Sequence, residues 1–149
     1  MGSIGKRYFQ GIYLNHANLR GAKLTMANLK EADLSGADLS ESNLNGVDFS
    51  QANLSGADLS NADLRSANLS DVNLIGADLT GAKLGRANLR RADLRSANLT
   101  NVDLTGAILD EVEMSGADLT GANVNQTELS EACSHLGVSH KWITWAGSH

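Results

Sequence analysis

Residues 52–64 read ANLSGADLSNADL, and this stretch decides the fold. A leucine returns every fifth residue, an alanine stands two places before each leucine, and Asp or Asn lies between them. The spacing runs without insertion from Leu14 to Leu129, which gives 24 central positions, 21 of them leucine. The preceding small residue is alanine in 17 of the 24 units. The chain is therefore a long internal repeat of five residues.

A period of five fits neither a plain helix nor a plain strand. On an α-helix every fifth residue drifts by about 140°, so the leucines form no single stripe. On a flat strand every fifth residue changes face. Both conflicts vanish if the chain bends after each short extended stretch, with the alanine and leucine inward and Asp or Asn outward. The Gly and Asn common at the last position suit such a corner, because they tolerate positive φ.

The glycines at the corner position indicate how many corners close one coil. Gly36, Gly56, Gly76 and Gly116 are separated by multiples of 20 residues. The pattern predicts four sides and 20 residues per coil, and about six coils in the chain. At the usual strand spacing of about 4.8 Å, such a stack is about 29 Å tall.

The runs ANLSG, ADLSN, ANLRR and ADLTG resemble the A(D/N)LXX signature of pentapeptide-repeat proteins over about residues 12–132. The resemblance implies an all-β fold, a right-handed quadrilateral (four-sided) parallel β-helix solenoid, with type II or type IV turns at the corners. The handedness comes from the resemblance alone. We expect an N-terminal cap over 1–11, the β-helix over 12–132 and a non-repeat C-terminal cap over 133–149.

Composition narrows the class of protein. The chain has 149 residues, a net charge of −5 and a single cysteine, Cys133. A general nucleic-acid binder needs a basic excess, so no nucleic-acid partner is expected. No apolar run approaches the length of a membrane span, and the start MGSIGKRYFQ lacks the apolar stretch of a signal peptide. We expect a soluble, cytoplasmic protein with no membrane partner.

The ends of a solenoid need covering, because they expose apolar edges. At the N-terminal end we expect Tyr8, Phe9 and Tyr13 to cover the first coil. The C-terminal tail holds both tryptophans, and we expect a lid formed by Leu136, Trp142, Ile143 and Trp145. An alternative interpretation of the same residues is an interaction surface that joins two copies in a homodimer.

Candidate chemistry is sparse. Cys133, His135 and His140 form the one cluster of metal-ligand side chains, but their spacing fits no standard zinc pattern. A solvated cap is the interpretation we favour for this cluster over a metal or thiol site. No phosphate-binding or dinucleotide motif occurs, and a Leu/Ala interior leaves no room for a substrate. We expect no enzyme activity, no cofactor, no metal and no catalytic residue.

The outward positions carry more information. Placing residues 20 apart above one another aligns Asp38, Asp58, Asp78 and Asp118 in one column, interrupted by Asn98, and we name these four aspartates the acidic stripe. It is a candidate surface for a basic partner, or simply a solvated face. The same stacking predicts cross-coil ion pairs of Arg91 with Asp71 and Glu111, Lys83 with Asp63 and Asp103, and Arg90 with Asp110. It leaves Arg86 and Arg95 without an acidic residue 20 positions before or after them.

Two functions follow as hypotheses. The first is a non-enzymatic scaffold that binds another protein, of undefined specific role, as the resemblance implies for many bacterial and cyanobacterial members. The alternative is a DNA mimic that binds DNA gyrase or topoisomerase IV, as the quinolone-resistance members of the family do. The modest net charge, the arginine cluster and the lack of a loop insertion over residues 12–132 count against the alternative.

Overall fold

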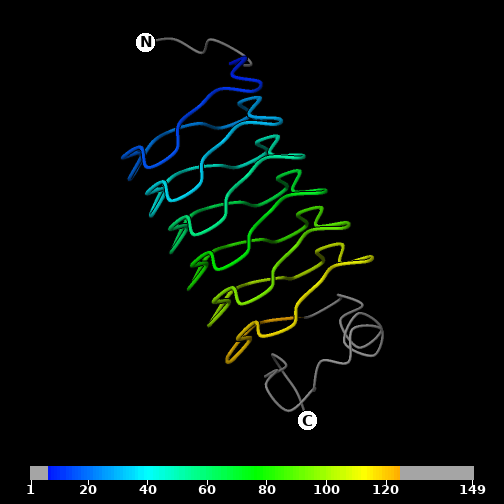
Figure 1. Cartoon of the computed structure of the whole chain (residues 1–149). Helices are drawn as coiled ribbons and strands as arrows, with labels where there is room; N and C mark the ends of the chain where they lie inside the picture. Colours follow the sequence, from blue (N-terminus) through cyan, green and yellow to red (C-terminus); the bar gives the residue numbers. More distant parts are fainter. Residues whose placement is uncertain (1–6, 125–149) are drawn as a thin grey trace.

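The computed structural model describes residues 7–124. Within this range the chain winds into a stack of coils that lie one above another (Figure 1). The predicted cap over 133–149 lies outside the described residues, together with Leu136, Trp142, Ile143, Trp145, Cys133, His135 and His140. Nothing in residues 7–124 is a helix long and apolar enough to cross a membrane.

The strands are as short as the five-residue repeat requires. Each repeat contributes one isolated bridge residue, from Tyr8 to Asn123, and two turn residues follow it after one intervening position. Every bridge is parallel and joins residues 20 apart, such as Asn53 with Asn73. Four such segments occupy each 20-residue period. The described chain is therefore a parallel β-helix solenoid of pentapeptide repeats.

Backbone hydrogen bonds hold successive coils together in the same way throughout. The Leu54 N–H donates to the Asn73 carbonyl at 2.7 Å, and the Asn73 N–H donates to the Ala52 carbonyl at 3.0 Å. At the corner, the Gly56 N–H donates to the Ile75 carbonyl at 2.9 Å. Because extended residues and turn residues both find partners in the neighbouring coil, the stack satisfies backbone groups that an isolated five-residue strand would leave unpaired.

The interior is filled by the side chains of the small and the central residues. From Ala27 to Val124 every small residue and every central residue is buried, including Phe49 and Met114 in place of leucine. Ser42 replaces alanine at one small position, and its hydroxyl donates to the Leu39 carbonyl. The inward assignment made from the alternation of small, polar and large residues is confirmed, because none of the polar middle residues in this range is fully buried.

The corners are uniform. At every described corner the central residue's carbonyl accepts the N–H three positions on, as in Leu54 to Ala57. The second turn residue always has a positive φ, in ten glycines and thirteen other residues. This combination defines a type II turn, and it settles a choice that the sequence left open between two turn types.

The corners with a non-glycine residue at positive φ are positions where a change to glycine can raise the stability of the protein. Ser96 has a φ of 59°, a conformation that costs an L-residue about 1–2 kcal/mol relative to glycine. We expect Ser96→Gly to raise the melting temperature by about 2–8 °C. The reverse change, Gly76→Ser in the coil below, is expected to lower it by a similar amount. A Cβ at Gly76 would meet nothing within 4 Å. The fall in melting temperature of Gly76→Ser therefore measures the cost of the positive φ and not a steric clash. Calorimetry that shows both variants melting with the parent would contradict this reading of the corners.

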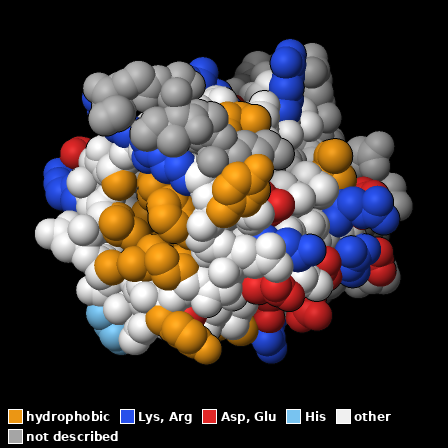
Figure 2. Space-filling model, turned by 90° about the horizontal axis from the view of Figure 1, so that it is seen from above, with side chains coloured by type: hydrophobic (Ala, Val, Ile, Leu, Met, Phe, Trp, Pro, Cys, Tyr) orange, Lys and Arg blue, Asp and Glu red, His pale blue; other side chains and the backbone are white. Residues whose placement is uncertain are grey.

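The first coil is only partly covered. Hydrophobic side chains gather on the end of the stack when it is seen from above (Figure 2). Phe9, Ile12 and Leu14 are partly buried against the core, but Tyr8 and Tyr13 are 76 % and 81 % exposed. The expectation that these two tyrosines cover the coil is wrong, because both occupy the outward middle position. Arg7 makes a polar contact at this end of the stack: its guanidinium donates to the Lys23 carbonyl at 2.7 Å.

Candidate functional site

The acidic stripe follows one side of the coil stack. Parallel bridges connect Asp38 with Asp58, Asp58 with Asp78, Asp78 with Asn98 and Asn98 with Asp118. The first three aspartates are half-buried and Asp118 is exposed. The structure thus brings the four predicted residues into one column, with neighbouring members one strand spacing, about 4.8 Å, apart.

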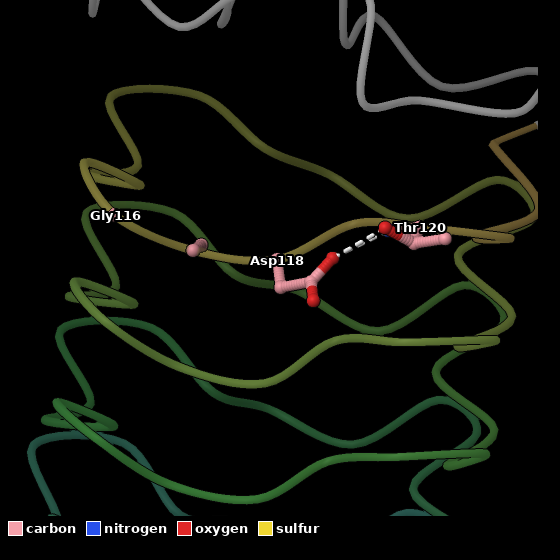
Figure 3. A pocket seen from close by; sticks show the side chains of 4 residues that line it. Gly116, Asp118 and Thr120 are labelled. Carbon is pink, nitrogen blue, oxygen red and sulfur yellow. Dashed lines mark hydrogen bonds between the residues drawn. The ribbon is translucent and has the colours of Figure 1, made fainter.

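Each carboxylate of the stripe has a local structural task that sequence reasoning missed. Oδ1 of Asp58 accepts the Ser60 N–H at 2.9 Å and the Ser60 hydroxyl at 2.6 Å. Asp118 and Thr120 repeat the arrangement at 3.0 and 2.6 Å (Figure 3). The same two bonds occur at Asp38 with Ser40 and at Asp78 with Thr80. The signal that could have shown this is a Ser or Thr two residues after each aspartate.

This task does not require a charge. Asn98, in the same column, accepts the Thr100 N–H and hydroxyl through Oδ1 at 3.0 and 2.6 Å. Asn53 does the same for Ser55 on another side. Because a carbonyl oxygen serves as well as a carboxylate oxygen, the negative charges of the stripe are dispensable for the turn.

The stripe also stacks like charges that form no direct ion pair within residues 7–124. Bridges between two acidic residues occur at Asp38–Asp58, Asp58–Asp78 and Asp93–Glu113 in the described chain. In the third case Arg95 lies with both acids, at 2.6 Å from Asp93 and 3.9 Å from Glu113. No ion pair within 4.0 Å reaches the four stripe aspartates among residues 7–124. Like charges directly opposite across strands repel one another, and asparagine at the same positions would remove that repulsion while keeping the acceptor oxygen.

The arginines lie mostly beside acids on the other sides and corners. Red and blue side chains adjoin one another around the rim of the molecule (Figure 2). The predicted pairs of Arg91 with Asp71, at 2.8 Å, and Arg90 with Asp110, at 3.9 Å, are confirmed. Each is half-exposed, so each contributes little to stability.

Other parts of the predicted charge pattern differ in the structure: no ion pair within 4.0 Å joins Lys83 to Asp103 or Arg91 to Glu111 in the described chain. Arg95 has no acid 20 residues away, as predicted, but its side chain folds back to Asp93, two residues before it. Arg65 holds Asp63 in the same way, with both guanidinium–carboxylate bonds at 2.7–2.8 Å. Asp63 is therefore occupied by Arg65, and no ion pair within 4.0 Å joins it to Lys83.

Protonation of the stripe carboxylates is expected to change the free energy of unfolding. Hydrogen bonds from the Ser40 hydroxyl, and next from its N–H, hold the pKa of Asp38 below its usual 3.8. Thr120 lowers the pKa of Asp118 in the same manner. Stability from a lowered carboxyl pKa is present above pH 3.8 and is lost as the pH falls through the folded-state value.

We therefore expect the parent protein to lose stability on acidification below about pH 4, and Asp38→Asn/Asp118→Asn to show a shallower dependence. Asparagine keeps the acceptor oxygen and does not titrate. Urea unfolding between pH 2.5 and 7 measures both slopes. Two identical slopes would show that these carboxyls are not preferentially stabilised in the folded state.

Other chemistry is scarce in residues 7–124. No group of three or more His, Cys, Asp or Glu side chains lies close enough to hold a metal ion in this part of the chain. A surface hollow of about 340 Å³ beside the last described coil is lined by Gly116, Ala117, Asp118 and Thr120. A second hollow, of about 430 Å³, lies at the corner that contains Gly85 and Arg86.

The parallel bridges at a spacing of 20 residues and the apolar interior define a solenoid protein built from five-residue repeats. The model of the family of pentapeptide repeats matches in eight copies, over residues 8–36, 32–71, 42–81, 73–110 and 97–133. The chain belongs to the pentapeptide repeat family. No curated protein sequence matches it significantly.

Solved pentapeptide repeat proteins are similar to this chain. HetL, from the cyanobacterium Nostoc sp. strain PCC 7120 and involved in heterocyst differentiation regulation, is 35% identical, with 83% of this chain and 67% of HetL covered and a TM-score of 0.37. The protein alr5209 of Nostoc PCC 7120 is 40% identical, with 64% and 72% covered and a TM-score of 0.45. QnrB1, a plasmid-mediated fluoroquinolone resistance protein, is 17% identical, with 95% and 82% covered and a TM-score of 0.36.

Proposed function

We propose that this chain is a non-enzymatic scaffold that binds a basic protein surface through the acidic stripe. The observation that carries the proposal is the pair of acid–acid bridges, Asp38–Asp58 and Asp58–Asp78, whose carboxylates form no ion pair within 4.0 Å among residues 7–124. The nearest cation to act on them is Arg20, which bonds the Ser40 hydroxyl beside Asp38. The turns function equally well with asparagine, as Asn98 shows. A row of charges that the turns do not need is a candidate functional surface.

The chemistry of the partner follows from the spacing and the exposure of the stripe. Oδ1 of each carboxylate is engaged by its own turn, which holds the group in one orientation. A partner that presents lysines or arginines along an extended segment or along one helix face matches a row of charges about 4.8 Å apart. Such contacts steer association and weaken with added salt.

The test compares the parent with a variant that carries asparagine at all four stripe positions. We expect the Asn variant to fold, because asparagine keeps the acceptor oxygen of each turn, and to lose the partner. Affinity capture from the native host identifies proteins held by the parent and absent from the variant. Binding of each purified protein is then measured against both forms at low and high salt.

A matched control removes four charges elsewhere: Asp33→Asn, Asp48→Asn, Asp103→Asn and Glu111→Gln. These carboxylates have no ion pair within 4.0 Å in the described chain and lie outside the stripe. The control and the Asn variant have equal net charge, so only a stripe-specific partner separates them. A partner lost equally from both, or retained by both, would refute the stripe as its binding site.

A DNA mimic that binds DNA gyrase or topoisomerase IV is the second candidate, favoured by the same row of carboxylates. The charge density weighs against it. Duplex DNA of about 29 Å carries about 17 charges, whereas the whole chain has a net charge of −5. A supercoiling assay with and without a quinolone tests it. Neither inhibition nor protection at micromolar protein would exclude this function.

We infer for the architecture that the coils are right-handed and four-sided and number about six. Parallel bridges at a spacing of 20 residues, with four corners in each period, support this inference. The roles of residues 133–149 as a cap or homodimer interface, and the cytoplasmic location, stay predictions. Analytical ultracentrifugation of the full chain and of Trp142→Ala/Trp145→Ala tests the dimer.

A further inference from the structure

The corner that contains Gly85 differs from every other described corner. The first turn residue is a polar, charged or large side chain at each of the others, and a glycine only here. Gly85 has no positive φ, so its conformation does not call for glycine. The missing side chain leaves a gap between Arg65 in the coil on one side and Thr105 in the coil on the other. Asn45, Ser66 and Arg86 complete the lining of this hollow of about 430 Å³, which we name the Gly85 notch.

Arg86 is the cation of the notch that has no partner. Its guanidinium takes part in no ion pair or hydrogen bond among the described residues, unlike Arg90, Arg91 and Arg95. It stands at a corner with a φ of 60°, where glycine would be less strained. Because no ion pair or hydrogen bond of the described residues engages this guanidinium, an external anion is the partner that its position suits.

Three of the other lining groups can donate as well, whereas Thr105 presents its backbone carbonyl oxygen, which accepts the Arg86 N–H. Arg65 uses Nε and Nη2 for Asp63 and keeps Nη1 available. The Ser66 hydroxyl and the Asn45 amide make no hydrogen bond within the described chain. The acids nearby are engaged: Asp63 with Arg65, and Asp103 with the Thr105 N–H and hydroxyl.

We propose that the Gly85 notch binds a phosphate dianion, either as free inorganic phosphate or as the monoester of a phosphorylated protein segment. Donors from three successive coils approach the gap from several directions, which suits the oxygens of a tetrahedral group better than a planar carboxylate. Arginine is the side chain that recognises phosphate most specifically. The notch lies at a corner that does not border the acidic stripe, so this site stands or fails independently of the proposed function.

The test titrates the full chain with inorganic phosphate, with a short phosphoserine peptide and with the same peptide unphosphorylated, followed by calorimetry and ³¹P NMR. Arg86→Gly removes the cation and relieves the corner, so we expect an unchanged or higher melting temperature together with at least about tenfold weaker phosphate binding. Gly85→Ile fills the gap, as Ile75 does at an equivalent corner position, and is expected to weaken binding similarly.

Arg91→Gly is the matched control, because it removes an arginine with a φ of 58° from another corner. We expect its phosphate affinity to stay within about twofold of the parent. Tighter binding of the phosphopeptide than of inorganic phosphate supports a protein-borne group, and equal binding supports the free ion. Absence of binding by the parent, equal weakening in Arg91→Gly, or equal affinity for the unphosphorylated peptide would each overturn the proposal.

Discussion

Leu64→Ala is expected to destabilise the protein by about 2–5 kcal/mol. Leu64 is fully buried, and leucines 20 residues before and after it continue the same interior column. Neighbouring coils are tied together by backbone bonds at every side, so they cannot collapse into the space that the side chain leaves. For a chain of this size the loss corresponds to a fall in melting temperature of about 5–20 °C.

Leu24→Ala is the control for this prediction, because Leu24 lies at the partly covered end and is only partly buried. Its loss should be clearly smaller than that of Leu64→Ala. Thermal melts of the two variants beside the parent measure the difference. Equal losses at Leu24 and Leu64 would mean that burial along the stack does not set the cost.

Ala62→Leu is expected to be comparably damaging for the opposite reason. Ala62 is fully buried in an interior packed at crystal-like density, where extra methylenes force side chains and backbone apart. Such overpacking costs about 1–3 kcal/mol, and more where the backbone cannot move. Here the bonds between coils restrain it on both sides.

Valine offers a graded comparison at this position. Val47, Val72 and Val102 occupy equivalent small positions and are fully buried, so Ala62→Val should cost less than Ala62→Leu. Urea denaturation of the two variants gives the order directly. A leucine variant as stable as the valine variant would show that the interior has spare volume at this level.

The interior could be predicted because its rule is purely geometric. A small residue, a polar residue and a leucine in five-residue units leave one way to bury apolar side chains, and Ala62 and Leu64 obey it. The corner geometry was less accessible. Met26 and Arg86 adopt positive φ values that their side chains disfavour, because the neighbouring coils enforce the turn whatever residue stands there.

The surface could be predicted only in part. Stacking residues 20 apart located the column of Asp58 and the pair of Arg91 with Asp71, since the register is rigid. It missed the pair of Arg95 with Asp93, because a long side chain can also turn back along its own strand. It missed the link from Asp58 to Ser60 because that bond lies within one repeat and not between coils.

The register of 20 residues restricts how this protein can change in length. Duplication of a 20-residue unit would lengthen the rod and leave every column continuous. Insertion of one five-residue unit between Asp58 and Asp78 would instead place Asn73 opposite Asp58, and all later columns would shift by one side. Surface patterns that cross several coils, such as the acidic stripe, can therefore be inherited through whole-coil duplications and are erased by single-repeat ones. A surface pattern of this kind is therefore preserved only when whole coils of 20 residues are duplicated, although the fold itself repeats every five residues.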